Sequence, residues 1–131
     1  MADPRIPGGR RSLRGRANQA GGVAAEVVAA TALEADGWTV LGRRLRTPAG
    51  EVDLIAERDG LLAIIEVKRR ARLADAALAL GPKQRARLIA AAEILLAEHP
   101  DWGQAGVRFD VLLVDANGAV RRIADAFRLE A

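Results

Sequence analysis

The segment Gly50–Lys68, GEVDLIAERDGLLAIIEVK, decides the fold, because it reads as two apolar β-strands joined by a short turn. Asp59-Gly60 is a dipeptide that favours the left-handed backbone of a two-residue hairpin loop. With these two residues at the centre of the turn, Arg58 faces Leu61, and a four-residue loop gives the same register. The sequence therefore predicts an antiparallel hairpin whose cross-strand partners are fixed.

Acidic side chains meet across this predicted hairpin. Asp53 faces Glu66 and Glu51 faces Lys68, and the alternation of side chains puts all four on one face. The opposite face is expected to be apolar throughout: Val52, Leu54, Ala56, Ala63, Ile65 and Val67.

Two opposed carboxylates repel each other by on the order of 3 kcal/mol at ~5 Å and an effective dielectric near 20. A shared proton, a bound divalent cation or partial neutralisation by Lys68 would offset this repulsion. The alternative is a solvated hairpin end on which the pair is ordinary surface. The strongly apolar flanking runs argue against that alternative.

Composition limits the chemistry that the chain can perform. The 131 residues contain no Cys and a single His, His99, which excludes thiol catalysis and Cys-ligated zinc and argues against histidine-based zinc sites and catalytic triads. Any metal would be held by oxygen, which favours Mg²⁺, Mn²⁺ or Ca²⁺. No apolar run reaches the ~20 residues that span a bilayer, and the N-terminus lacks the apolar core of a signal peptide. We expect a cytoplasmic protein with no membrane partner.

Basic residues are concentrated at the N-terminus and are nearly all Arg. The net charge is +3, and 18 of the 20 basic residues are Arg. Residues 1–20 are predicted to form a basic, disordered arm, or alternatively an inert tail, and residues 21–131 a single domain. Arg forks match phosphate geometry, which makes nucleic acid a candidate partner. A genome-wide preference for Arg and Ala would explain the same ratio.

The remaining pattern predicts an α/β fold with a mixed sheet, flanked by helices and containing a central hairpin, in the order α-β-β-β-α-β-β. The helices are expected over 22–36, which Gly37 ends, and 81–100, which has Pro near both ends. The strands are expected over 37–47, 51–57, 61–68, 107–114 and 119–124.

Further polar residues accompany the acidic hairpin. Glu26 interrupts an apolar helix, either as a favourable first-turn acid or as an additional ligand for the acidic centre. Asp110 interrupts an apolar strand, and we expect it to be a structural partner of a nearby Arg. Lys83 and Arg87 oppose the dipole of their helix, and either a phosphate contact or a solvated helix face accounts for them.

Clusters of Arg precede and follow the acidic hairpin. An acidic metal pocket with a basic rim suits a phosphodiester, because the rim holds backbone phosphates and the pocket holds the metal. The rim residues are Arg43, Arg44 and Arg46, and Arg69, Arg70 and Arg72.

These residues resemble the PD-(D/E)XK nuclease superfamily, in which an Asp on one strand and Glu-x-Lys on the next form the site. Asp53 matches the Asp, and Glu66-Val67-Lys68 matches Glu-x-Lys. More narrowly, the chain resembles the bacterial YraN family of uncharacterised, endonuclease-like proteins over about residues 21–114. Four segments carry this resemblance: GGVAAEVVAATALEADGW, GEVDLIAERDGLLAIIEVKRR, GPKQRARLIAAAEILL and VRFDVLLV.

The resemblance implies roles for particular residues. Asp53 and Glu66 would ligate the metal with the Val67 carbonyl, and Glu26 would be the acid that many members add. Lys68 would orient or deprotonate the attacking water, or stabilise the charged transition state. Glu51 would pair with Lys68 or lie at the edge of the site.

The implied activity is a Mg²⁺- or Mn²⁺-dependent endonuclease acting on DNA, in particular branched or structured DNA. The alternatives are a catalytically silent nucleic-acid-binding module of the same fold and a protein-interaction adaptor that uses the Ala/Leu-rich second helix. Cleavage of a four-way junction would require paired sites and hence a homodimer, for which the sequence marks no interface.

Overall fold

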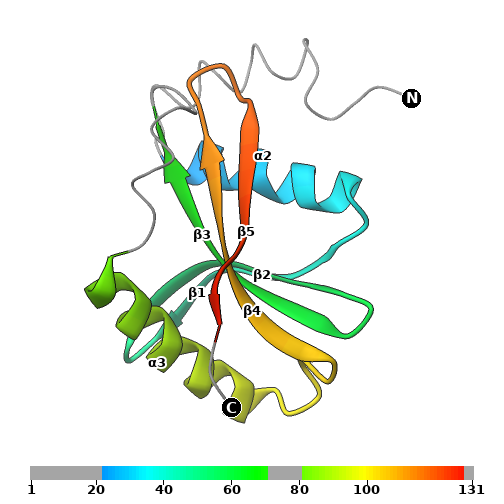
Figure 1. Cartoon of the computed structure of the whole chain (residues 1–131), viewed down its shortest axis with the longest axis vertical. Coiled ribbons are helices and arrows are strands. Elements are labelled where there is room, and N and C mark those ends of the chain that lie inside the picture. The colour runs from blue at the N-terminus through cyan, green and yellow to red at the C-terminus, as the bar shows by residue number, and fades with distance from the viewer. Residues whose placement is uncertain (1–21, 71–80, 129–131) are drawn as a thin grey trace.

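The computed structural model describes residues 22–70 and 81–128 of the chain, which form a five-stranded mixed sheet with two helices (Figure 1). The basic arm and Arg72 lie outside these residues. Within the described ranges, neither helix is long and apolar enough to cross a membrane. The elements are α2 (Gly22–Ala35), β1 (Thr39–Thr47), β2 (Gly50–Arg58), β3 (Leu61–Arg69), α3 (Pro82–Glu98), β4 (Gly106–Val114) and β5 (Val120–Arg128).

The strands lie in the sheet in the order of the chain, β1-β2-β3-β4-β5. β3 and β4 are parallel, with α3 in the connection between them, and all other neighbours are antiparallel. The predicted hairpin register is confirmed from Arg58, which pairs with Leu61, to Leu54, which pairs with Ile65. Asp59 and Gly60 both have positive φ, as a tight turn between twisted strands requires.

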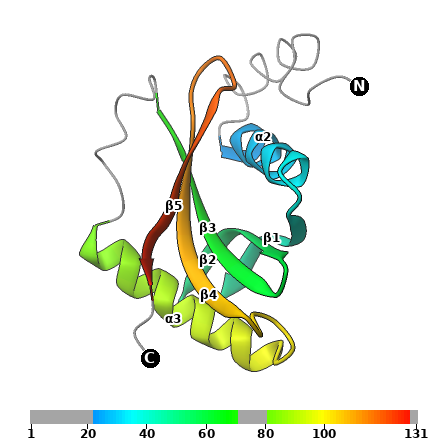
Figure 2. The same cartoon turned by 45° about the vertical axis from the view of Figure 1, so that its right-hand side comes forward.

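Each helix covers its own face of the sheet (Figure 2). Because side chains alternate along β3, Ala63 and Ile65 pack with α2, whereas Leu62 and Ile64 pack with α3. On the α2 side the helix contributes Ala25, Val28, Ala29, Ala30 and Leu33. On the α3 side the helix contributes Leu88, Ala91, Ala92 and Leu95.

Strand β2 breaks this alternation at the acidic residues. Leu54 and Ala56 belong to the α2 cluster, whereas Val52 packs with Ile55 in the α3 cluster. The expectation that Val52 shares the face of Leu54 is therefore wrong. The two residues are an even number apart, so the backbone changes its facing between them, at Asp53. The regular pairing of β2 with β3 also ends at Leu54, directly beside Asp53.

A second cluster of charged residues, separate from the acidic residues at Asp53, lies beyond the end of α2. Gly37 adopts φ +87, and the Trp38 N–H donates to the Leu33 carbonyl at 3.0 Å, a C-terminal cap that a glycine makes accessible. Trp38 is thereby buried in the core on the α2 side.

Asp110 is buried next to Trp38 and serves as the structural partner that its place in an apolar strand predicted. Its Oδ2 accepts hydrogen bonds from Arg122 Nη2 at 2.7 Å and from Arg108 Nη2 at 3.1 Å. Both guanidinium groups also lie over the Trp38 ring, at 4.7 and 5.1 Å from its centroid. One carboxylate therefore holds two cations against one aromatic ring.

We expect Asp110→Ala to lower the free energy of unfolding by about 3–5 kcal/mol, because it leaves two partly buried guanidinium groups without their shared acceptor. Urea denaturation of the variant beside the wild type measures this loss. Asp101→Ala is the control, since Asp101 is exposed in the turn that follows α3. Equal stability of the wild type and the Asp110 variant would contradict the assigned role.

Candidate metal centre

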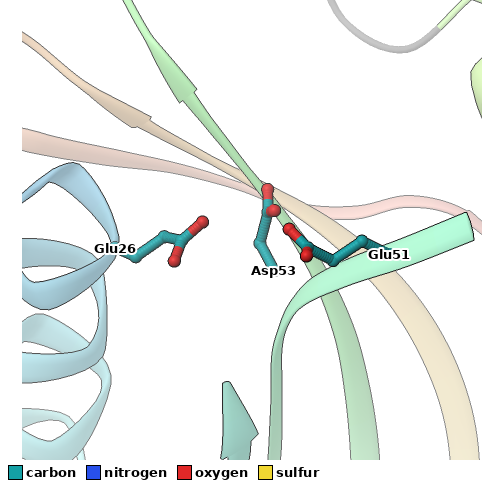
Figure 3. A group of neighbouring side chains, drawn as sticks. All are labelled: Glu26, Glu51 and Asp53. Carbon is teal, nitrogen blue, oxygen red and sulfur yellow. The ribbon is translucent and has the colours of Figure 1, made fainter. Parts of the chain in front are cut away.

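Three carboxylates from two elements meet where β2 changes its facing. Glu26 comes from α2, and Glu51 and Asp53 come from β2. Each residue offers one carboxylate oxygen, and these three oxygens all lie within 4.8 Å of one another. Figure 3 shows Glu26 reaching from the helix toward Asp53, with Glu51 on the other side of Asp53. We call these residues the acidic trio, and its donor atoms are all oxygen, as Mg²⁺ and Mn²⁺ prefer.

Burial disfavours the state in which all three carboxylates of the trio are negatively charged. Burial raises the pKa of Glu26 from 4.5 to about 7, and the neighbouring charge of Asp53 adds to this effect. Burial also raises the pKa of Asp53, although the Val67 N–H donates to its Oδ2 at 2.8 Å and acts in the opposite direction. Without a metal, the trio therefore favours retention of a proton near neutral pH.

Glu66 lies beside the trio but is not part of it. The residue is only 9% exposed, and its Oε2 lies 3.4 Å from Arg87 Nη2 and 3.8 Å from Lys68 Nζ. Its Oε1 is buried and has no hydrogen-bond partner among the described residues. Burial first, and the charge of Asp53 second, raise the pKa of Glu66. Oε2 of Glu66 therefore pairs with cations, whereas Oε1 could still accept a bond from a ligand.

The expected arrangement of four side chains on one face needs correction. Glu51 pairs with Arg44 and Arg46, at 4.0 and 3.5 Å, and it joins the trio, whereas Lys68 pairs with Glu66. Glu51 and Lys68 have different partners because the change of facing at Asp53 separates the start of β2 from the regular hairpin. Glu51 accompanies Asp53, as their spacing of two on a strand predicted.

Arg87 of α3 holds this region together. Arg87 was a predicted candidate for a phosphate contact, but its guanidinium donates to the Glu51 carbonyl at 2.9 Å and lies against Glu66. Gly50 makes room for it, since a Cβ there would lie 2.9 Å from Arg87 Cδ. Arg87 thus ties α3 to both β2 and β3 at the acidic centre. Its predicted neighbour, Lys83, is exposed.

The basic rim divides into paired and outward-facing residues. Arg44 and Arg46 reach acids of the trio, and Arg43 lies 4.0 Å from Glu34 on α2. Arg69 is exposed, and Arg70 donates to the Arg69 carbonyl at 2.7 Å. Their binding to nucleic acid, like the metal ligation by Asp53, Glu66, Glu26 and the Val67 carbonyl, stays a prediction.

Comparison with known proteins shows the family of this chain. The sequence profile of the Uncharacterised protein family UPF0102 matches residues 25–114, a range that includes the acidic trio, Glu66 and Lys68. The chain belongs to this family, the YraN family. The resemblance drawn from the hairpin is thereby confirmed at the level of the family.

UPF0102 proteins of several bacteria align with most of the chain. The chain is 63% identical to one from Granulibacter bethesdensis over 92% of its own length and 77% of the relative's. It is 48% identical to one from Azorhizobium caulinodans over 99% of both chains. It is 45% identical to one from Rhodopseudomonas palustris over 81% of its own length and 82% of the relative's.

The raised pKa of Glu26 predicts that the metal-free protein loses stability as pH rises. Above 4.5 an unfolded Glu releases its proton, whereas folded Glu26 keeps it up to about pH 7, so protonation favours the folded state over this window. In EDTA, the free energy of unfolding should fall between pH 5 and 8, with Glu26 contributing at most about 3 kcal/mol. Glu26→Gln should flatten this slope, and Glu34→Gln on the exposed side of the same helix should not. A wild-type slope retained in full by Glu26→Gln would contradict the shift.

We expect Arg87→Gln to destabilise the protein by about 1–3 kcal/mol at pH 8, because the buried Glu66 then loses a partly buried cationic partner. The loss should shrink at pH 5, because the pKa of Glu66 is raised and its negative charge therefore weakens as the pH falls. Chemical denaturation at both pH values measures the difference, with Lys83→Gln at the exposed start of α3 as the control. An equal loss at both pH values would show that Arg87 acts through packing alone.

Proposed function

We propose that this UPF0102 protein is a metal-dependent nuclease that hydrolyses phosphodiester bonds in DNA, including branched or structured DNA, on a PD-(D/E)XK core. The observation that carries the proposal is the acidic trio beside Glu66, one oxygen of which has no hydrogen-bond partner within residues 22–70 and 81–128. Lys68 lies at the same place, with Nζ 3.8 Å from Glu66 Oε2. A mixed sheet with one helix on each face is compatible with the proposed core.

The residues present fit Mg²⁺ or Mn²⁺. Every candidate donor is an oxygen, and the buried Oε1 of Glu66 has an unused acceptor capacity that a cation would satisfy. Asp53 and Glu66 would hold the ion with the Val67 carbonyl. Glu26 and Glu51 would complete the ligand set or accept hydrogen bonds from water at the site.

A bound Mg²⁺ would neutralise charge on the scissile phosphate and lower the pKa of the attacking water. The residues of the chain supply the rest of the chemistry. Lys68, which pairs with Glu66, would orient that water or stabilise the negative charge that develops on the phosphate. The exposed Arg43 and Arg69 would bind neighbouring phosphates of the backbone.

A catalytically silent nucleic-acid-binding module is the second candidate, and the ion pairs around the trio favour it. Arg44 and Arg46 already neutralise part of the acidic charge without a metal. In that case the basic rim would bind DNA through counterion release, and affinity would fall steeply with salt.

The test is a panel of linear, nicked, flap and four-way DNA substrates with Mg²⁺ or Mn²⁺, beside EDTA controls. We expect cleavage of at least one form, and a loss of at least about 100-fold in rate for Asp53→Asn and Glu66→Gln. Glu93→Gln, exposed on α3, is the matched control for removal of a charge.

The outcomes separate the two candidates. Cleavage that survives in both site variants would contradict the assigned centre. A panel that stays uncut, with salt-sensitive DNA binding, would instead support the silent module.

A further inference from the structure

Arg44 of β1 places its guanidinium between two members of the acidic trio. Its Nε lies 3.9 Å from Glu26 Oε1 and 4.0 Å from Glu51 Oε1. Among the described residues, Arg44 is the one cation within salt-bridge distance of both these carboxylates. Its charge also acts to lower the pKa of Glu26, in opposition to burial.

The backbone at Arg44 is unusual as well. Arg44 has φ +51, in the left-handed region that residues other than Gly, Asn and Asp seldom occupy. Along β1, Arg43 pairs with Leu54 and Leu45 pairs with Val52, so Arg44 is level with Asp53. The unusual backbone of β1 thus coincides with the change of facing in β2. With this backbone conformation, the Arg44 side chain reaches the trio.

The neighbouring arginines of β1 behave differently. Arg43 pairs with Glu34, outside the trio, although its side chain is 48% exposed and that of Arg44 is 45% exposed. Arg46 lies within salt-bridge distance of Glu51 alone and is largely exposed. Position on the strand, and not exposure, distinguishes Arg44 from Arg43.

We propose that Arg44 is a built-in competitor for the metal: its guanidinium neutralises the acidic trio while no ion is bound, and it leaves when a divalent cation binds. This inference rests on the proposed metal site. Two cations cannot share the same carboxylate oxygens without strong repulsion, because both draw on the same negative charge. The partly exposed side chain can swing into solvent, where a phosphate of the substrate is the natural partner for it.

Competition of this kind has two measurable consequences of opposite sign. Arg44→Gln removes the competing charge, so it should tighten Mn²⁺ binding. The same change leaves Glu26 and Glu51 without the cation that they share, so it should destabilise the metal-free protein. A residue that merely stabilises the fold would not tighten metal binding.

The experiment is titration calorimetry of Mn²⁺ into the wild type, Arg44→Gln and Arg43→Gln, with melting temperatures recorded in EDTA and in saturating Mn²⁺. We expect Arg44→Gln to bind Mn²⁺ about tenfold more tightly, or about 1.4 kcal/mol. Its melting temperature should lie below wild type in EDTA, and Mn²⁺ should raise it by more than it raises the wild type. Arg43→Gln should match the wild type in affinity.

The outcomes separate the inference from the function beneath it. Equal or weaker Mn²⁺ binding by Arg44→Gln, with binding that Asp53→Asn abolishes, overturns the competitor role and leaves the metal site standing. No Mn²⁺ binding by any of the proteins overturns both. Arg44→Asn tests the same prediction with a residue that tolerates the left-handed backbone, and it replaces the Gln variant if that one fails to fold.

Discussion

Repulsion among confined carboxylates is the constraint around which this structure is organised. Glu26, Glu51 and Asp53 meet where β2 changes its facing, and the charge of Asp53 also acts on Glu66. Burial removes the water that would screen these charges, so the pKa values of Glu26, Asp53 and Glu66 are all raised. Carboxylates with pKa values raised in this way are typical of sites that bind a cation or transfer a proton.

The fold offsets part of this repulsion with arginine. Arg87 reaches from α3 to Glu66 and to the Glu51 carbonyl, and Arg44 and Arg46 reach from β1 to the trio. The second charged cluster, beyond the end of α2, is built differently, because Asp110 there is an acceptor shared by Arg108 and Arg122. The two clusters differ in how the acid is used: Asp110 accepts hydrogen bonds from two arginines through one oxygen, whereas one oxygen of Glu66 has no hydrogen-bond partner among the described residues.

Local sequence signals predicted the regular parts of this structure and missed the irregular one. Asp59-Gly60 set the hairpin register, and Gly37 marked the end of the first helix, because turn chemistry is a local property. The grouping of Glu51 with Glu26, away from Lys68, could not follow from strict alternation, since the backbone changes its facing at Asp53. The left-handed backbone of Arg44 and the reach of Arg87 depend on tertiary contacts, which periodicity does not encode.

Anomalous diffraction from crystals of the wild type grown with Mn²⁺ would show whether the acidic centre binds a metal, because it locates the ion without reference to activity. We expect one or more Mn²⁺ peaks within about 2.5 Å of carboxylate oxygens of Asp53 and its acidic neighbours, with Arg44 turned away from Glu26. If Mn²⁺ occupies other carboxylates of the protein and leaves the acidic centre empty, these residues do not form a metal site.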